Sequence, residues 1–356
     1  MTTSETATTD DRNTNTGFEE TAGAMRRPAS GPWATAFRKL LRDKAAMGAL
    51  VVFVAIVIGC CFAPYYANEV AHTDPFRSNI SGEIEIDGKS QPVLEPSTEG
   101  LGLGTIPIGP TWHLSGYFLG ADEQGRDVFA RMLYGGLNSL FIAGAATVIC
   151  LIFSAMLGVV AGFFGGVVDA VLSRIMDIIW AFPIFLLAIS LSIVLINTSI
   201  SLGPISVRAG SLWLPIFIIG IVYVPYIARP IRGQVLSLKH SEFVLAAIGL
   251  GVPSWRILVK DILPNVVTTL IVFVPLMMAL NMLTESALSY LSIGVQPPDA
   301  SWGTIIQDGE GLLYTRPAVA LAPGIAIAVT VLALNVFGDG VRDALDPRSK
   351  LRLGRD

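Results

Sequence analysis

Six long apolar segments limit what this 356-residue chain can fold into. Each is close to the roughly 20 residues that a helix needs to cross a bilayer. Only a helix satisfies its own backbone hydrogen bonds in lipid, so we expect an all-α integral membrane protein with six transmembrane helices. The third segment contains Arg174, Asp177 and Pro183 and is the least regular. The predicted spans are residues 45–63, 137–164, 171–197, 212–231, 264–284 and 317–337.

Composition and charge support this class. Charged residues make up 15% of the chain, whereas soluble domains contain about a quarter. The net charge of −4 averages a basic and an acidic side of the membrane, so it does not suggest nucleic-acid binding. The cysteines Cys60, Cys61 and Cys150 all lie in apolar segments, and we expect buried thiols that face lipid or other helices, with no disulfide or metal role.

Lysine and arginine residues predict the orientation of the spans, because cytosolic loops carry an excess of them. They gather before the first span, in the hairpin after the fourth and in the tail after the sixth. With six crossings these three regions share one side, which we assign to the cytosol together with both termini. The segment 64–119 has Arg77 and Lys89 against a majority of acidic residues, so we expect it outside.

These signals divide the chain into five parts. The insertion includes a predicted β-hairpin, in which Ile84 and Ile86 precede the turn pair Asp87-Gly88. Residues 31–44 are basic and amphipathic. They either lie on the membrane surface or form the cytosolic start of the first helix. The parts are a disordered cytosolic tail (1–30), an amphipathic lead-in with the first transmembrane helix (31–63), a small external insertion (64–119), a helical core with a cytosolic hairpin (120–340, hairpin 240–258) and a cytosolic C-terminal tail (341–356).

The stretch 243–265 is basic and amphipathic, although it lies between two apolar segments. A water-facing hairpin inside a membrane domain suits docking onto a cytosolic motor. Its spacing resembles the EAA loop of binding-protein-dependent ABC import permeases, with Leu245 at the family's glutamate position. This resemblance implies a short coupling helix at 243–258 that contacts an ATPase. The coupling residues that it implies are Glu242, Ala246, Ala247, Gly251, Pro253, Trp255 and Pro264.

Two further stretches resemble peptide and nickel import permeases. Residues 119–127, LGADEQGRD, are similar to a family motif at the external rim, whose matching residues include Asp122, Gly125, Arg126 and Asp127. Here we favour local packing: Asp122 caps the next helix, and Arg126 can pair with Asp127. Residues 288–303, LSYLSIGVQPPDASWG, resemble a second family motif and suit a re-entrant external turn.

The resemblance implies a type I ABC importer permease fold and a role like that of the "C" permease of dipeptide, oligopeptide or nickel importers. The implied partners are a second homologous permease, two ATPase subunits (or one used twice), and an extracytoplasmic substrate-binding protein. ATP and Mg would be bound by the ATPases, while this chain would bind no cofactor and catalyse no reaction. Peptides are the expected cargo, with nickel, glutathione or another small solute as alternatives. The expected location is the bacterial plasma (inner) membrane.

Two other classes of function compete with this interpretation: an ion-driven secondary transporter and a structural membrane protein. A secondary transporter would be expected to show inverted repeats, and the hairpin would then have no purpose. Asn281 and Glu285 lie one turn apart on the fifth span. They are either pathway or gate residues, or Glu285 is an interfacial carboxylate at the external helix end.

Several short motifs do not indicate a catalytic or ligand-binding site. Gly88-Lys89-Ser90 lacks the earlier glycine of a phosphate-binding loop. The three histidines are isolated, so no metal site is predicted. Gly158, Gly162 and Gly166 recur at the spacing that lets helix backbones approach closely. For these glycines we expect packing within the chain rather than a contact between two copies.

Overall fold

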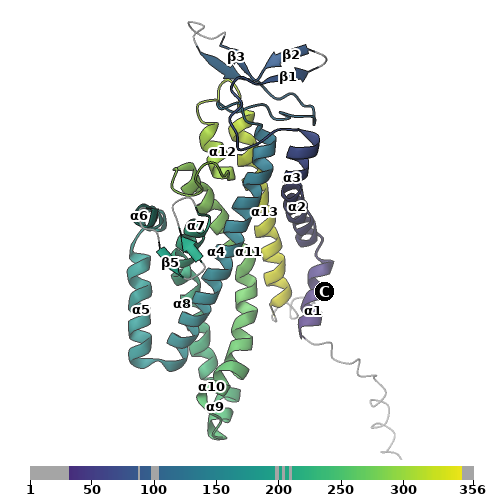
Figure 1. Cartoon of the computed structure of the whole chain (residues 1–356). Coiled ribbons are helices and arrows are strands. Elements are labelled where there is room, and N and C mark those ends of the chain that lie inside the picture. Colours follow the sequence, from purple (N-terminus) through teal and green to yellow (C-terminus); the bar gives the residue numbers. More distant parts are fainter. Residues whose placement is uncertain are drawn as a thin grey trace, which may run out of the picture.

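An elongated helical bundle with short β-hairpins at one end forms the structure (Figure 1). The computed structural model describes residues 32–86, 89–97, 104–196, 200–202, 205–207 and 211–346. The predicted disordered tail, 1–30, and most of the predicted C-terminal tail lie outside the described residues. The expected turn pair Asp87-Gly88 lies outside them as well.

Among the described residues, four helical segments are long and apolar enough to cross a membrane alone. Two bent pairs pass the same test together, which raises the number to six if each pair is one span. The prediction of a helical membrane protein is therefore confirmed. The four segments are α2 (Lys44–Cys61), α4 (Val128–Phe164), Ser254–Tyr290 and α13 (Ala318–Leu345); the pairs are α5 with α6 (Gly166–Ala181, Ile184–Ile196) and α7 with α8 (Trp213–Val222, Val224–Lys239).

The third predicted span is not a straight helix. Its two halves, α5 and α6, meet at an angle of 92°. Phe182 at the break has an extended backbone, and Pro183 follows it. Proline lacks an N–H and disfavours the helical conformation in the residue before it, so the helix ends at this point. The fourth span bends by 41° at Tyr223, just before Pro225.

Helix α4 is the centre of the bundle and packs against α2, α7, α8 and α11. A Cβ on Gly158 would lie 2.7 Å from the Ala228 carbonyl oxygen, and one on Gly162 would lie 2.8 Å from Val235. These two glycines therefore let α4 and α8 touch, which confirms the expected packing within the chain. Gly166 instead has φ +56° at the turn into α5.

The described residues 63–127, here called the cap, cover one end of the bundle (Figure 1). The expected hairpin is confirmed, with Glu83 opposite Pro92 and Ile86 opposite Lys89. The elements of the cap are α3 (Ala63–Tyr65), the π-helix η1 (Tyr66–Val70), β1 (Glu83–Ile86), β2 (Lys89–Pro92), β3 (Leu94–Pro96) and β4 (Thr105–Pro107). Its small core consists of Val93, Ile108, Tyr117 and Ala121, with Ile84 packed against it.

Helix α1 (Pro32–Arg42) is separate from α2, because Asp43 caps α2 and accepts from the amides of Ala45 and Ala46. Lys39 donates to the Asp343 carbonyl and so holds α1 against α13. The remaining elements are β5 (Ile200–Leu202), β6 (Ile205–Val207), α9 (Glu242–Gly249), α10 (Ser254–Ile257), the π-helix η2 (Leu258–Ile262), α11 (Leu263–Tyr290) and α12 (Trp302–Asp308).

Candidate functional site

The predicted docking segment forms two short helices, α9 and α10, at the end of the bundle opposite the cap (Figure 1). Residues 242–257, which lie within the predicted hairpin 240–258, are called the hairpin from here on. Helix α8 leads into it, and α10 continues through η2 into α11 without a break. The hairpin is therefore attached directly to a long helix that runs through the bundle.

Glycine at position 251 makes the turn between the two short helices. Helix α9 ends at Gly249, and Gly251 has φ +73°, a conformation that glycine adopts cheaply. The amide of Val252 donates to the Ala247 carbonyl at 3.1 Å and closes the end of α9. Pro253 then precedes α10 in an extended conformation. The turn at Gly251 therefore separates the two short helices.

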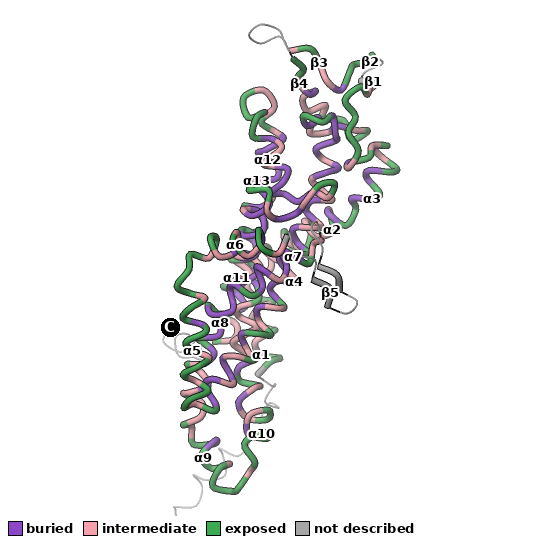
Figure 2. The backbone as a smooth tube through the Cα atoms, turned by 60° about the vertical axis from the view of Figure 1, so that its left-hand side comes forward, coloured by how far each residue is buried: buried purple, intermediate pink, exposed green. Residues whose placement is uncertain are grey.

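The hairpin exposes an apolar surface that nothing in the described chain covers. Leu250 is 84% exposed and Trp255 is 67% exposed, and Figure 2 draws this part of the tube largely as exposed. Val244 and Ile257 are buried and hold the hairpin to the bundle. Contiguous exposed apolar surface marks a docking site. We call the exposed set the hairpin tip: Phe243, Leu245, Ile248, Leu250 and Trp255.

The structure brings the predicted coupling residues to this one end. Ala247 is partly buried and Pro264 lies in the first turn of α11. The others are exposed on the hairpin: Glu242, Ala246, Gly251, Pro253 and Trp255. The charged residues Glu242 and Arg256 of the hairpin are also exposed, as is Lys260 just after it. A mixed surface of this kind is typical of a protein contact that forms in water.

Buried charges dominate the opposite end. Arg126 contacts Asp122 at 2.7 Å and Asp308 at 2.9 Å, while Arg131 contacts Asp308 at 2.8 Å. Asp122, Arg126 and Arg131 are buried, whereas the Asp308 side chain is 33% exposed, so the cluster pairs three buried charges with one at the edge of the solvent. We call these four residues the rim cluster. It joins the cap to α4 and to the end of α12.

Two sequence expectations for this motif are wrong. Asp127, not Asp122, caps α4 and accepts from the amides of Phe129 and Ala130, because the helix begins at Val128. Asp122 instead accepts from the Arg126 amide and pairs with its guanidinium, so no Arg126–Asp127 ion pair forms. Gly125 has φ +72°, which permits the tight turn between them.

Arg131 and Asp308 were not singled out in the sequence. Arg131 carries a weak signal, since a basic residue in the second turn of a strongly apolar helix needs a partner. Asp308 has no local signal, because it meets Arg126 only through the fold.

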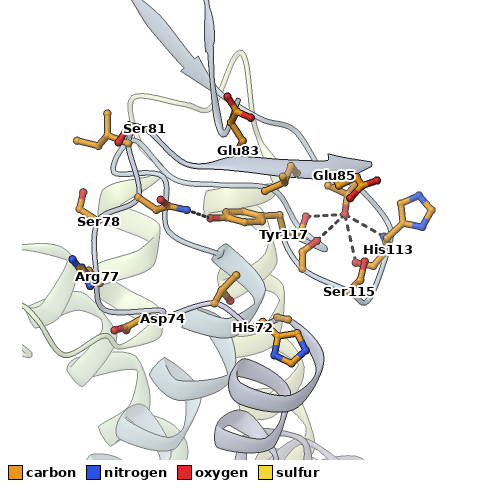
Figure 3. A pocket seen from close by; sticks show the side chains of 17 residues that line it. His72, Asp74, Arg77, Ser78, Ser81, Glu83, Glu85, His113, Ser115 and Tyr117 are labelled. Atoms are coloured by element: carbon orange, nitrogen blue, oxygen red, sulfur yellow. Dashed lines mark hydrogen bonds between the residues drawn. The ribbon is translucent and has the colours of Figure 1, made fainter. Parts of the chain in front are cut away.

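A polar cavity of about 740 Å³ lies in the cap (Figure 3). Its lining includes Asp74, Arg77, Glu85, His113 and Tyr117. The Tyr117 hydroxyl donates to the Gly125 carbonyl at 3.1 Å, and burial raises the pKa of this phenol. Within the described residues, no group of histidine, cysteine and acidic side chains could hold a metal ion.

The two candidate pathway residues are fully buried within this chain. Asn281 donates to Thr147 at 2.9 Å. Glu285 accepts from Ser289 at 2.7 Å, so it is not an exposed interfacial carboxylate. In this conformation neither side chain is exposed to a pathway.

Sequence comparisons agree with this architecture. Residues 154–351 match the family described as "Binding-protein-dependent transport system inner membrane component". Residues 31–81 match the "N-terminal TM domain of oligopeptide transport permease C".

Similar proteins include three curated permeases. The dipeptide transport system permease protein DppC of Alkalihalophilus pseudofirmus is 34% identical over 90% of this chain and 92% of its own length. The oligopeptide transport system permease protein OppC of Bacillus subtilis is 34% identical over 89% of this chain and 90% of its own. The glutathione transport system permease protein GsiD of Pectobacterium atrosepticum is 34% identical over 66% of this chain and 74% of its own. This chain therefore belongs to the inner-membrane permease family of binding-protein-dependent ABC importers.

Proposed function

We propose that this chain is one permease subunit of an ATP-driven importer of dipeptides or oligopeptides. The observation that carries the proposal is its similarity, over about nine-tenths of both lengths, to the DppC and OppC proteins. The match to the N-terminal domain of oligopeptide permease C supports it independently. The subunit would work with a second, homologous permease and an external substrate-binding protein.

The hairpin is the proposed contact with the ATPases. Its exposed apolar tip suits a short helix that enters a groove on a partner. ATP and Mg would be bound by the ATPases, and this chain would bind no cofactor. Closure of the ATPase pair on ATP would draw the two hairpins together, tilt the helices and open the pathway towards the binding protein.

The same proposal orients the molecule, with the hairpin and both termini in the cytosol and the cap outside. Arg256 and Lys260 lie at the hairpin end, and basic residues of α1 lie on the same side of the bundle (Figure 1). Cysteine labelling tests this, using a variant that lacks the three native cysteines. Ser90→Cys should react with an impermeant thiol reagent in intact cells, and Ser254→Cys should react only after lysis. The reverse pattern would overturn the orientation.

Uptake by cells that lack this subunit tests the cargo. Deletion of the gene should abolish uptake of labelled dipeptides or oligopeptides, and a plasmid copy should restore it. Unchanged uptake of every peptide length would contradict the proposal.

Glutathione is the second candidate cargo, because the GsiD protein is also 34% identical to this chain. The same strain, supplied with labelled glutathione, separates the two. Loss of glutathione uptake with peptide uptake intact would favour this alternative.

A further inference from the structure

We propose that one face of α5 and α8 lines a water-filled part of the transport pathway and holds the carboxylate of passing cargo. The choice of ligand rests on the proposed function, because every peptide with a free C-terminus carries a carboxylate. The exposure of this face to water does not rest on it. We call the residues that form this face the pathway patch: Arg174, Asp177 and Trp180 of α5 with Tyr226 and Arg229 of α8.

Helix α5 has two opposite faces, one polar and one apolar. Residues that are three or four positions apart lie on the same side of a helix. The exposed apolar residues of α5 follow this spacing two positions before the polar ones, which turns them to the other side. We assign the apolar side to lipid and the polar side to protein or water. The polar residues are Asp169, Ser173, Asp177 and Trp180, and the exposed apolar residues are Val167, Val171, Ile175 and Ile178.

Polar contacts hold α5 against α8, and Figure 1 shows the two helices side by side. Arg232 donates to Asp169 at 2.6 Å, and Arg229 donates to Asp177 at 2.9 Å. Among the described residues of α5, Met176 alone is buried. Charged contacts therefore run along the interface of two segments that both belong to candidate membrane spans.

The pathway patch is open at the level of Asp177. The side chain of Arg174 is 82% exposed, that of Asp177 is 51% exposed and that of Arg229 is 40% exposed. Asp177 lies about 12 Å further along the helix than Asp169, so its short side chain cannot reach back to the membrane surface. Charges with this exposure are costly against lipid and normally face protein or a water-filled cavity.

The balance of charge favours water over a protein contact. Arg174 and Arg229 lie 3.7 Å and 2.9 Å from Asp177, so two positive charges share one negative charge. A protein that sealed this face would bury the unpaired guanidinium unless it supplied an acidic residue of its own, and an unpaired buried charge is strongly unfavourable. Water or a mobile anion satisfies it without that requirement.

The same excess charge selects the ligand, because guanidinium groups bind carboxylates through paired N–H donors. The Trp180 and Tyr226 rings stack with their centroids 6.0 Å apart, and the Arg229 guanidinium lies 5.4 Å from the Trp180 ring centre. A flat apolar wall thus borders the charge and suits side chains next to a peptide carboxylate. Since Asp177 already pairs with both arginines, the hold on a carboxylate is weak, as a pathway requires.

Cysteines introduced along α5 test the exposure to water, in a complex that is purified through a tag on this chain and lacks its three native cysteines. Ala170→Cys and Ala181→Cys lie in line with Arg174 and Asp177, while Ile175→Cys lies between them in depth on the apolar side. The complex is placed in lipid nanodiscs, and charged, water-soluble thiol reagents are added without nucleotide and after trapping with ATP and vanadate.

Both alanine positions should react at least about tenfold faster than Ile175→Cys in at least one of the two states, because a charged reagent does not enter lipid. Equal, slow reaction at all three positions in both states would overturn the proposal. It would show that lipid or the second permease covers this face.

The charge of the reagent tests the excess positive charge. At Ala181→Cys an anionic reagent should react at least about threefold faster than a cationic one, after correction for their reaction with free cysteine. Arg229→Gln removes the excess charge and should abolish this preference. Arg174→Gln, at a more exposed side chain, does the same if Arg229→Gln does not fold. The control is Arg42→Gln, which removes an exposed positive charge from α1. An unchanged preference in both patch variants would overturn the carboxylate site.

Protection from labelling tests the ligand. An excess of a dipeptide should slow the labelling of Ala181→Cys, whereas the same dipeptide with a C-terminal amide should not. Equal protection by the two, or protection by neither, would refute the carboxylate site and leave the face exposed to water. Reagent access requires no cargo, so these outcomes are distinct from a wrong cargo assignment, which the uptake assays decide.

Discussion

The hairpin end and the cap end differ in which side chains they expose and which they bury. At the hairpin end, large apolar side chains such as Leu250 and Trp255 are exposed. At the cap end, charged side chains such as Arg131 and Asp122 are buried. A soluble surface normally shows neither pattern, so each needs a specific reason.

The two ends differ in where the partners of these side chains lie. Every charge of the rim cluster has its partner within the chain, so this cluster needs no other molecule. The apolar hairpin tip has no such partner among the described residues, and we propose that the ATPases cover it. The rim cluster is thus satisfied within the chain, whereas the hairpin tip is the proposed contact with a partner.

Removal of Arg131 should have the largest effect on the fold. Arg131→Met leaves Asp122 and Asp308 with Arg126 alone, and breaking a buried pair costs about 3–5 kcal/mol. The control is Arg174→Met, whose side chain is exposed and lies 3.7 Å from Asp177. That change should cost less than about 1 kcal/mol. Thermal unfolding in detergent measures both, and equal melting temperatures would show that the rim cluster does not stabilise the cap end.

A smaller effect is expected between the two ends, where α4 and α8 touch. Gly158→Ala places a methyl group 2.7 Å from the Ala228 carbonyl oxygen, and such overpacking costs about 1–3 kcal/mol. Gly233→Ala is the matched control, since its added methyl group meets nothing within 4 Å. As a helix substitution it should stabilise by about 0.5–1 kcal/mol. The same unfolding assay reads both, and a stabilising Gly158→Ala would show that the bundle tolerates separation of these helices.

The smallest effect on the fold is expected at the hairpin tip. Trp255→Ala removes an exposed ring and should change the unfolding free energy by less than about 0.5 kcal/mol. The buried Trp302 provides the contrast, because Trp302→Ala should cost about 3–5 kcal/mol. Trp255→Ala should nevertheless reduce the ATPases recovered with the tagged chain. A Trp255→Ala variant that is destabilised as much as Trp302→Ala, or that retains all of the ATPases bound to wild type, would contradict this difference between the two ends.

Sequence reasoning predicted the hairpin end because local chemistry defines it. Gly251 adopts a positive φ and Pro253 lies just before the next helix, so these two positions specify the turn. The β-hairpin of the cap was predictable for the same reason. Alternating isoleucines and a short turn pair are read within ten residues.

The cap end could not be predicted in the same way. Arg126 meets Asp308 across 182 positions of sequence, and only the packing of α12 brings them together. Sequence reasoning also chose Asp122 rather than Asp127 as the residue that caps α4. Both aspartates precede the apolar segment, so either could cap its first turn. The third span was expected to be the least regular because it contains Pro183, but its continuous apolar composition did not predict a bend as large as 92°.

We propose that the hairpin transmits motion without supporting the fold, and Gly251→Val is the direct test of this role. Valine at φ +73° is strained by at least about 1–2 kcal/mol, so the turn must change and the tip must move. Gly249→Val is the matched control: both glycines are exposed with open space around them, but only Gly251 has a positive φ.

The measurement is uptake per ATP hydrolysed in liposomes that contain the purified complex. Gly251→Val should insert normally yet lose its ATPases, or hydrolyse ATP with little uptake, while Gly249→Val should stay near wild type. A Gly251→Val complex that retains its ATPases and transports at the wild-type ratio would contradict the claim that this hairpin is the coupling element.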